Sequence, residues 1–579
     1  MTSSPPAWIV LGRSPDGLVS VALDADGAEI ERRSFDDDAL PGEIRRVEDA
    51  GGPGPRWVWS DTPEWYERLL DEGVRVARCH DLRLCHAILR DSRLVADAAD
   101  LRAATAWDAA ASVEAGRDDQ ALFALEDESP ARPAGPPSSV AAALEEFARQ
   151  REAIRAAADP GRLRLLCSAE SAGALIASEL RHAGLPWDAA VHDRILVDIL
   201  GERPRGTGAP ARIDELAKRV RRELDDPTAN LDSQPKLLQA LHRAGVMVHS
   251  TSRWELGEHE HPVIEPLIEY RRLSRLLSAN GWNWLSEWVH DGRFRPVYVP
   301  AGVVTGRWAS SGGGALQIPR QLRGAVRADP GWAFVVADVA QLEPRVLAAM
   351  ARDVDLAAAA RGRDLYAGVV ESGAVSTRQE AKIALLGAMY GATTGDSGRL
   401  VPRLRRTYPR SMALVDAAAR TGEDGGVVST WLGRTAPAPS PAWMTAQSRA
   451  SDADATEGDV TRARRWARDR GRFTRNFVVQ GTAAEWALVW LGDLRARLAA
   501  FPRTGDQASA GRSGASFAHQ AHLVFFLHDE LIVHTPAADA ERAADAVRGS
   551  AAAAAGLLFG GFPIDFPLDL RIARTAEKS

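Results

Sequence analysis

Residues 523–534 read LVFFLHDELIVH, two apolar runs that meet at the acidic pair Asp529 and Glu530. The pattern predicts a tight hairpin that buries both carboxylates. A buried carboxylate costs several kcal/mol unless a cation or hydrogen-bond donors offset the loss of water. The hairpin therefore indicates a metal-binding or catalytic role for the two acids.

A second buried-strand pattern ends in an aspartate far upstream. Residues 332–338 read WAFVVAD, with Asp338 as the last residue. Two aspartates at strand ends, brought together in one sheet from distant parts of the chain, are the basis of a two-metal site for phosphoryl transfer. We therefore expect Asp338 and Asp529 to lie close together.

The bulk composition is that of an ordinary folded protein. The chain has 579 residues, of which 45% are hydrophobic and 26% charged, and its formal net charge is −7. This length predicts several domains, because single cores stop growing beyond roughly 250–300 residues. The charge argues against a general basic coat but allows a local basic stripe. Residues 462–475 carry seven arginines in fourteen residues, although such a stretch alone is more often a solvated helix face.

Cysteine usage and hydropathy indicate the compartment. Three cysteines and no apolar N-terminal signal segment predict a reducing, cytoplasmic location without disulfides. No stretch is apolar and long enough to cross a membrane. Cys79, His80, Cys85 and His86 suggest zinc, but their spacing lacks the paired form usual for tetrahedral ligation, so zinc is the weaker interpretation.

Strand and helix patterns divide the rest of the chain. Short apolar runs at 8–11, 18–23 and 56–59 predict strands of an N-terminal α/β unit. Residues 140–283 have mainly helical periodicity, and a further strand is predicted at 295–299.

One predicted helix carries a polar and aromatic series. Arg378, Lys382, Leu386 and Tyr390 recur every four residues in TRQEAKIALLGAMY, which begins at Thr377. Residues four apart share a helix face and drift by roughly 40° per step. Two cations in the N-terminal half, where the helix dipole is also positive, would suit a polyanion. Taken alone, a solvated face with Leu386 and Tyr390 in the core is the simpler interpretation.

Together these features resemble family A DNA polymerases, the group of bacterial DNA polymerase I. DVAQLEPR at 338–345, the helix from Arg378 to Gly391 and His528-Asp-Glu530 look like the family's motifs A, B and C, in the same order and spacing. Further similar stretches are TGR at 305–307, TWLGR at 430–434 and NFVVQGT at 476–482. The resemblance covers residues 183–579.

The resemblance implies an α/β multidomain chain. Its expected fold is the right-hand polymerase fold of palm, fingers and thumb, preceded by an RNase H-like domain of the exonuclease type. The expected domains are the exonuclease-like domain over 1–182, thumb and approach to the palm over 183–300, palm over 301–375, fingers over 376–450 and palm completion over 451–579.

The family's site residues carry over onto matching positions. Asp338, Asp529 and the backbone carbonyl of Val339 would hold two Mg²⁺ ions, for which Mn²⁺ can substitute, with Glu530 as a nearby acidic helper. The resemblance implies as catalytic residues Asp338, Asp529, Glu530 and Lys382. It implies as dNTP-binding residues Arg378, Lys382, Leu386, Tyr390, Gln341, Glu343 and Tyr366. It implies as DNA-contacting residues Arg307, Gly391, Arg434, Arg472, Asn476, Gln480 and His528.

Some positions matter for substrate choice. Glu343 would stand under the sugar and clash with a 2′-hydroxyl, which favours deoxynucleotides. Pro344 follows it and fits only in the first turn of a helix. Leu386 replaces a phenylalanine that stacks on the sugar, and Tyr366 replaces a phosphate-binding histidine. Tyrosine can donate a hydrogen bond but carries no positive charge at neutral pH. Val339 replaces a tyrosine of the family. None of these substitutions removes a metal ligand.

The N-terminal third departs from the family's 3′→5′ proofreading pattern, which needs four carboxylates. Alignment of residues 80–89 with the second exonuclease motif places Cys85 where an aspartate is required. Alignment of 167–171 with the third motif places Ser171 at another required aspartate, and no D-x-E pair ends an early strand. We expect a retained fold without proofreading, and no 5′-nuclease activity.

Two alternatives to a template-directed DNA polymerase stay open. A non-catalytic DNA-binding scaffold of the same fold is disfavoured, because a scaffold has no reason to retain buried acids such as Asp338 and Asp529. A single-subunit RNA polymerase of the related phage type is disfavoured by Glu343, since RNA synthesis needs a small residue there. The expected partners are primer-template DNA and dNTPs, with no membrane and a monomeric state.

Overall fold

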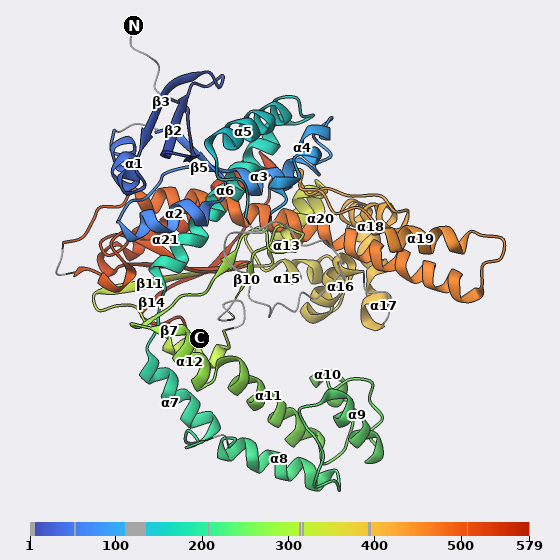
Figure 1. Cartoon of the computed structure of the whole chain (residues 1–579). Coiled ribbons are helices and arrows are strands. Elements are labelled where there is room, and N and C mark those ends of the chain that lie inside the picture. The colour runs from blue at the N-terminus through green and yellow to red at the C-terminus, as the bar shows by residue number, and fades with distance from the viewer. Residues whose placement is uncertain are drawn as a thin grey trace. The chain divides into compact units, whose positions relative to one another are not determined.

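The computed structural model describes residues 6–50, 54–109, 135–206, 208–311, 314, 318–391, 395–505 and 508–577 (Figure 1). The chain forms two compact units. The larger combines Met1–Gly184, Val297–Gly312 and Pro330–Ala573, and the smaller combines Leu185–Pro296, Gly313–Asp329 and Arg574–Ser579. The N-terminal third therefore belongs to the same compact unit as the acidic hairpin.

A five-stranded mixed sheet organises the N-terminal part of the larger unit. The order is β3-β2-β1-β4-β5, with β1, β2 and β3 antiparallel and β4 and β5 parallel to β1. The strands are β1 (Trp8–Ser14), β2 (Gly17–Leu23), β3 (Glu29–Phe35), β4 (Arg56–Trp59) and β5 (Cys79–Asp81). The helices of this part are α1 (Leu40–Glu48), α2 (Thr62–Asp71), α3 (Leu82–Leu89), α4 (Ala99–Ala103), α5 (Val140–Arg155) and α6 (Pro160–Ala183).

Alternation along β1 fills a core on each face of this sheet. Ile9 and Leu11 belong to one buried cluster and Val10 to the other, as the two-residue period of a strand requires. The strands predicted at 8–11, 18–23 and 56–59 are confirmed as β1, β2 and β4. The edge strand β3 has no such pattern, because its sequence EIERRSF is polar and almost wholly exposed.

The second sheet of the larger unit carries the predicted acids. Its order is β12-β13-β11-β14, and every neighbouring pair is antiparallel. The strands are β11 (Trp332–Val339), β12 (His522–Leu527), β13 (Glu530–Pro536) and β14 (Leu568–Ala573). The predicted hairpin and the predicted strand ending at Asp338 are both confirmed. Helix α21 (Ala540–Phe559) packs against β11, β13 and β14.

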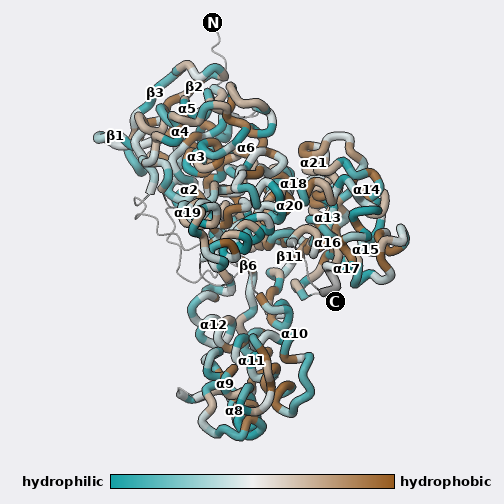
Figure 2. Tube along the Cα trace, turned by 90° about the vertical axis from the view of Figure 1, so that its right-hand side faces the viewer, coloured by the Kyte–Doolittle hydropathy of each residue, from teal (hydrophilic) through white to brown (hydrophobic). Residues whose placement is uncertain are grey.

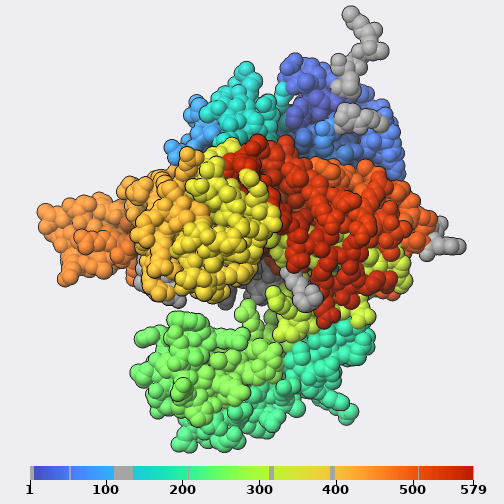
Figure 3. Space-filling view, turned by 180° about the vertical axis from the view of Figure 1, so that it is seen from behind, coloured from blue at the N-terminus to red at the C-terminus, as the bar shows by residue number. Residues whose placement is uncertain are grey.

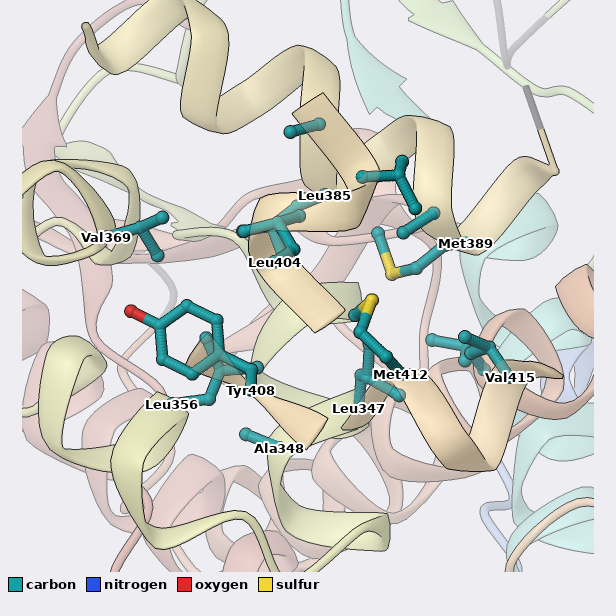
Figure 4. Close-up of a cluster of buried hydrophobic side chains, with 14 of the residues drawn as sticks. Leu347, Ala348, Leu356, Val369, Leu385, Met389, Leu404, Tyr408, Met412 and Val415 are labelled. Atoms are coloured by element: carbon teal, nitrogen blue, oxygen red, sulfur yellow. The ribbon is translucent and has the colours of Figure 1, made fainter. Parts of the chain in front are cut away.

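A group of helices follows β11 and shares one hydrophobic core. Leu347, Leu385, Met389 and Met412 meet there from three different helices, together with Tyr408, which directly precedes α18 (Figure 4). The helices of this group are α13 (Leu342–Met350), α14 (Val354–Ala360), α15 (Leu365–Glu371), α16 (Arg378–Tyr390), α17 (Gly395–Thr407) and α18 (Pro409–Glu423), and the exposed helix α19 (Pro441–Ala450) follows them. The long helix α20 (Glu457–Ala499) packs along α18 and returns the chain to the second sheet.

The smaller unit is mainly helical, as its sequence predicts. Its helices are α7 (Ala189–Leu200), α8 (Ala211–Glu223), α9 (Gln234–Arg243), α10 (Arg253–Leu256), α11 (Ile264–Asn280) and α12 (Trp282–Trp288). Hydrophilic and hydrophobic residues alternate along α8 and α11 (Figure 2), so each helix buries one face. A small sheet of β6 (Leu185–Pro186), β8 (Arg293–Phe294) and β7 (Val289–His290) adjoins a cluster of Trp187, Trp284 and Phe294.

The prediction of one continuous strand at 295–299 is wrong. The structure has β8 before it and β9 (Tyr298–Val299) at its end, and β9 pairs with β10 (Ala309–Ser310) in the larger unit. Pro296 lies between the two strands and has no backbone N–H to donate to a ladder. The chain therefore changes units where the sequence shows a continuous apolar run.

Candidate active site

The acidic hairpin of β12 and β13 lies directly beside the end of β11. Asp338 pairs in register with Glu530, and the backbone N–H of Val339 donates to the carbonyl of Asp529 over 2.9 Å. His528 occupies the turn with a left-handed φ of 54°. The structure thus brings Asp338 and Asp529 together, as the sequence predicts, while Glu530 is buried in the sheet with 3% exposure.

The electrostatics of the hairpin follow from this proximity. Burial and the neighbouring charge of Asp338 raise the pKa of Asp529 to about 6, against the opposing effect of Arg307. Burial and Arg307 lower the pKa of His528 to about 4, so that imidazole is neutral at pH 7. Two nearby carboxylates that repel each other are a suitable donor pair for a divalent cation.

The donor set fits a hard cation that keeps part of its water shell. Among the described residues, no group of three or more His, Cys, Asp or Glu side chains is arranged to hold a metal ion. Mg²⁺ typically needs only one or two protein carboxylates, completed by water and substrate phosphates. Asp338 and Asp529 supply two carboxylates, and the carbonyl of Val339 is predicted to add a third protein oxygen.

Glu343 is held on the other side of the site. Tyr390 donates its hydroxyl to Glu343 Oε2 over 2.7 Å, and Arg307 forms an ion pair with Glu343 Oε1. Burial and the charge of Glu343 raise the pKa of Tyr390. Pro344 lies in the first turn of α13, as expected, where its missing N–H costs no helical hydrogen bond.

Gln341 and Arg378 meet through Asp364. Arg378 donates to Asp364 Oδ2 over 2.8 Å, and Gln341 Nε2 donates to the same oxygen over 3.1 Å. Although burial would raise it, the bonded Arg378 lowers the pKa of Asp364. The Arg378 guanidinium also lies 5.4 Å from the centre of the Tyr366 ring. Three residues predicted to bind dNTP are therefore connected before any ligand binds.

Helix α16 has the predicted facial arrangement. Thr377 caps its N-terminus, and Lys382 and Tyr390 are exposed while Leu386 is half-buried. Gly391 ends the helix with a φ of 72°. A Cβ at Gly391 would lie 2.8 Å from Cγ of Arg472, so glycine is required by both backbone and space.

A cavity of about 240 Å³ opens between these elements. Seven residues predicted for the site line it, namely Arg307, Gln341, Glu343, Tyr366, Leu386, His528 and Asp529. Several alanines of α20 complete the wall. Residues separated by more than 200 positions thus converge on one space.

Helix α20 carries three further predicted DNA contacts. Asn476 and Gln480 are half-buried on it, and Arg472 is exposed and pairs with Asp469.

No helix among the described residues combines the length and apolar character needed to cross a membrane.

Arg434 is a predicted DNA contact whose side chain is largely enclosed by the protein. Its side chain is 11% exposed and pairs with the fully buried Glu170 of α6. It also packs behind the turn at Gly306, where a Cβ would lie 2.6 Å from Arg434 Nε. The guanidinium thus supports the turn before Arg307 and links it to the N-terminal part, and its role as a DNA contact stays a prediction.

Glu485 was missed by the sequence analysis. It is buried on α20 and accepts hydrogen bonds from Thr430 Oγ1 and from the backbone N–H of Leu432. Burial raises its pKa to about 7, although the bonds from Thr430 and Leu432 oppose this. Its signal is a lone acid within the apolar run AAEWALVW at 483–490.

The acids of the N-terminal sheet have protein partners. Asp81 Oδ2 accepts from the N–H and hydroxyl of Thr62, and its Oδ1 accepts from the N–H of Leu84. Arg83 Nε donates to Asp61 Oδ1 over 3.0 Å. Burial and the charge of Asp61 raise the pKa of Asp81. These carboxylates are engaged within the fold.

The two aligned exonuclease positions are adjacent in space. Cys85 Sγ lies 3.6 Å from Ser171 Oγ, with both residues fully buried. The histidines of the zinc alternative are hydrogen-bonded to side chains of α5, His80 to Gln150 and His86 to Glu146, each over 2.8 Å.

Comparisons with known proteins agree with this architecture. The family model described as DNA polymerase family A matches residues 209–574. The chain is 27% identical over 343 residues to the thermostable DNA polymerase I of Thermus filiformis, which covers 54% of this chain and 36% of that protein. It is 28% identical over 389 residues to DNA polymerase I of Chloroflexus aurantiacus, covering 60% and 37% respectively. The chain thus spans little more than a third of these relatives.

The fold resembles a solved structure along its whole length. That structure is the POL domain of Pol1 from M. smegmatis in complex with DNA primer-template and dNTP. The TM-score is 0.66 and the sequence identity 18%, and the match covers 100% of this chain and 96% of that chain. At this identity the likeness shows the fold.

Proposed function

The chain belongs to DNA polymerase family A, and on this basis we propose that it is a template-directed DNA polymerase that joins dNTPs to a primer 3′-hydroxyl. The observation that carries the proposal is the convergence of Asp338 and Asp529 beside a cavity lined by Glu343, Tyr366 and Leu386. A scaffold would gain nothing from two mutually repelling carboxylates at an open cavity.

Asp338, Asp529 and the carbonyl of Val339 would hold two Mg²⁺ ions, for which Mn²⁺ can substitute. Bound there, the ions would lower the pKa of the primer hydroxyl and neutralise the triphosphate. Glu530, buried beside Asp338, would add negative potential without being a ligand.

The other residues would bind and orient the substrates. Arg378 and Lys382 would contact the phosphates with Tyr366, and Lys382 Nζ would donate a proton to the leaving pyrophosphate. Glu343, fixed by Arg307 and Tyr390, would exclude a 2′-hydroxyl.

The nucleic-acid side of the site is primer-template DNA. Gly391 and Tyr390 would flank the templating base, and Arg472, Asn476 and Gln480 would contact the strands from α20. Gln341 would steady the dNTP side through Asp364. We propose that the protein acts as a monomer.

We also propose that the N-terminal part has a degenerate exonuclease-type fold without 3′→5′ proofreading. The support is the contact between Cys85 and Ser171 at the two aligned positions and the engagement of Asp61 and Asp81 by Arg83 and Thr62. A neutral thiol and a hydroxyl cannot replace two carboxylates on hard cations. No 5′-nuclease activity is proposed for these residues.

Primer extension tests the polymerase proposal. The wild-type protein should extend a labelled primer with dNTPs and Mg²⁺, extend it poorly with rNTPs, and show no extension in EDTA. Absence of extension with bound DNA would favour the scaffold, and efficient rNTP use would favour an RNA polymerase.

Incubation with a 5′-labelled single strand, Mg²⁺ or Mn²⁺ and no nucleotides tests the proofreading proposal. No shortening is expected. Shortening that persists in Asp338→Ala would contradict the proposal and indicate that Asp61 and Glu64 form a working site.

A further inference from the structure

The long helix α20 carries a row of polar side chains at a constant spacing of four. The row is Arg464, Arg468, Arg472, Asn476 and Gln480. Successive members share a helix face and shift by roughly 40°, so they form a continuous line that winds slowly around the helix. The family resemblance accounts for the last three members only. The first two lie beyond any motif.

Arg470 and Arg475 of the same helix are hydrogen-bonded within the fold, whereas Arg464 and Arg468 have no such bond among the residues that the structure describes. Arg470 donates to the carbonyls of Gly426 and Pro437, each over 3.0 Å, and Arg475 donates to the carbonyl of Ala388 over 2.8 Å. Arg464 and Arg468 are exposed and have no hydrogen bond or ion pair with any described residue. Two adjacent unneutralised cations on one face attract a polyanion.

The position of Arg472 gives the row a direction along the DNA. Its Cγ lies 2.8 Å from the place of a Cβ on Gly391, the residue assigned above to the templating base. On the C-terminal side of Arg472, Ala483 and Ala484 of the same helix line the cavity that contains Asp529. The copied end of the template therefore lies toward the C-terminal part of α20.

The N-terminal part of α20 extends the opposite way. Arg464 is eight residues before Arg472, which corresponds to ~12 Å of helix. This part forms an antiparallel pair with α19, and the orange hairpin projects at the surface of the larger unit (Figure 3). On the template path proposed above, Arg464 and Arg468 would therefore lie on the side that has not yet been copied.

We propose that Arg464 and Arg468 bind backbone phosphates of the uncopied template strand ahead of the templating base. The inference rests on the proposed polymerase function and adds a binding site to it. Arginine presents a fork of N–H donors to phosphate oxygens, so contacts of this kind are independent of base sequence. They would hold the incoming template in line with Arg472.

The chain offers a matched control. Arg462 lies on the same helix, is exposed and has no hydrogen bond or ion pair in the described part of the chain. It is two residues from Arg464 and therefore about 160° away around the helix. Removal of Arg462 changes the net charge by the same amount as removal of either row member but leaves the row intact.

The test measures equilibrium affinity for two primer-templates with the same duplex and template overhangs of one and ten nucleotides. Fluorescence anisotropy without nucleotides is used on the full chain and on R464A, R468A, R464A/R468A and R462A. Wild type should bind the long overhang more tightly. The double variant should lose about 25-fold on the long overhang at 0.1 M salt, because two single-strand phosphate contacts contribute a salt slope of about 1.4.

The remaining results separate the proposal from its alternatives. The double variant should lose less than twofold on the short overhang, R462A less than twofold on both, and R464K/R468K should recover most of the long-overhang affinity. Equal losses on both overhangs, or a loss in R462A equal to that in R464A, would overturn the inference. If wild type extends a primer but overhang length has no effect on affinity, this inference fails and the polymerase proposal stands.

Discussion

The larger unit contains two groups of aspartates that have opposite surroundings. At the end of β11, Asp338 and Asp529 are half-buried beside a cavity, and the nearby cation Arg307 is committed to Glu343. Next to β4 and β5, Asp61 and Asp81 are fully buried and are bound by Arg83, Thr62 and a helix N-terminus.

This difference teaches how to tell a working acid from a structural one. A carboxylate that the fold pairs with a cation and hydrogen-bond donors contributes stability, whereas two neighbouring carboxylates beside a cavity are placed to bind a cation from outside, as we propose for Asp338 and Asp529. The number of acids is similar in the two regions. Their partners distinguish them.

Asp529→Asn should have the largest effect and separates activity from stability. We expect primer extension to fall by at least about 10³-fold, because one cation-binding carboxylate is lost. The melting temperature should not fall, since the change relieves repulsion with Asp338. Single-turnover extension and thermal unfolding are measured together. Extension near the wild-type rate would remove Asp529 from the site.

Arg83→Met should show the reverse behaviour in the N-terminal part. The substitution leaves Asp61 and Asp81 buried without the nearby cation. The free energy of unfolding should therefore fall by about 3–5 kcal/mol, the usual cost of breaking a buried ion pair. Denaturant unfolding measures the loss, and extension per folded molecule should stay within about twofold. Arg155→Met, which breaks an exposed pair with Glu152, is the control and should leave the free energy of unfolding nearly unchanged. Similar losses in both variants would contradict the comparison.

Glu343 combines the two kinds of surroundings, since it is paired within the protein and also lines the cavity. Glu343→Ala should raise the relative use of rNTPs by about 10²-fold, because the obstacle to a 2′-hydroxyl is gone. Competition between dNTP and rNTP at one template position measures the ratio. Glu343→Gln retains the volume and should change it far less. An unchanged ratio in Glu343→Ala would place sugar selection elsewhere.

Glu485 gives the smallest expected effect, a pH dependence of stability. Its folded pKa of about 7 exceeds the ordinary value of 4.5, so the folded protein binds more protons than the unfolded chain between these values. Its contribution to stability is therefore present below pH 4.5 and is lost as pH rises through 7.

Glu485→Gln removes that titration. The melting temperature of wild type relative to the variant should decline by about 2 °C between pH 5 and pH 8. A constant difference across this range would show that Glu485 does not titrate there.

Much of the site was predictable because its signals are local. The hairpin at Asp529, the strand ending at Asp338 and the face of α16 each depend on periodicity within a dozen residues. The strand β14 was not predicted, because LDLRIA is a half-exposed edge segment that pairs with β11 more than 220 residues away. The ion pair between Arg434 and Glu170 of the N-terminal part could not be predicted from the sequence either, since 264 residues separate the two.

Domain boundaries were less predictable than elements. The predicted thumb region 183–300 corresponds closely to one segment of the smaller unit, Leu185–Pro296. That unit also contains Gly313–Asp329 and Arg574–Ser579. A division of the sequence into consecutive domains cannot group these three separate segments. The predicted boundaries of fingers and palm stay predictions.

The uninterrupted length of α20 restricts how this sequence can change over evolution. Its 43 residues carry the arginine row, Asn476 and Gln480, the buried Glu485, and Arg495, which is tied to Glu179 of the N-terminal part. One inserted or deleted residue would rotate everything beyond it by about 100° and shift it by about 1.5 Å. Substitutions on the exposed face can accumulate one at a time, but a change in length between Arg464 and Arg495 would misalign several sites at once. The spacing itself is therefore what descendants of this chain must inherit.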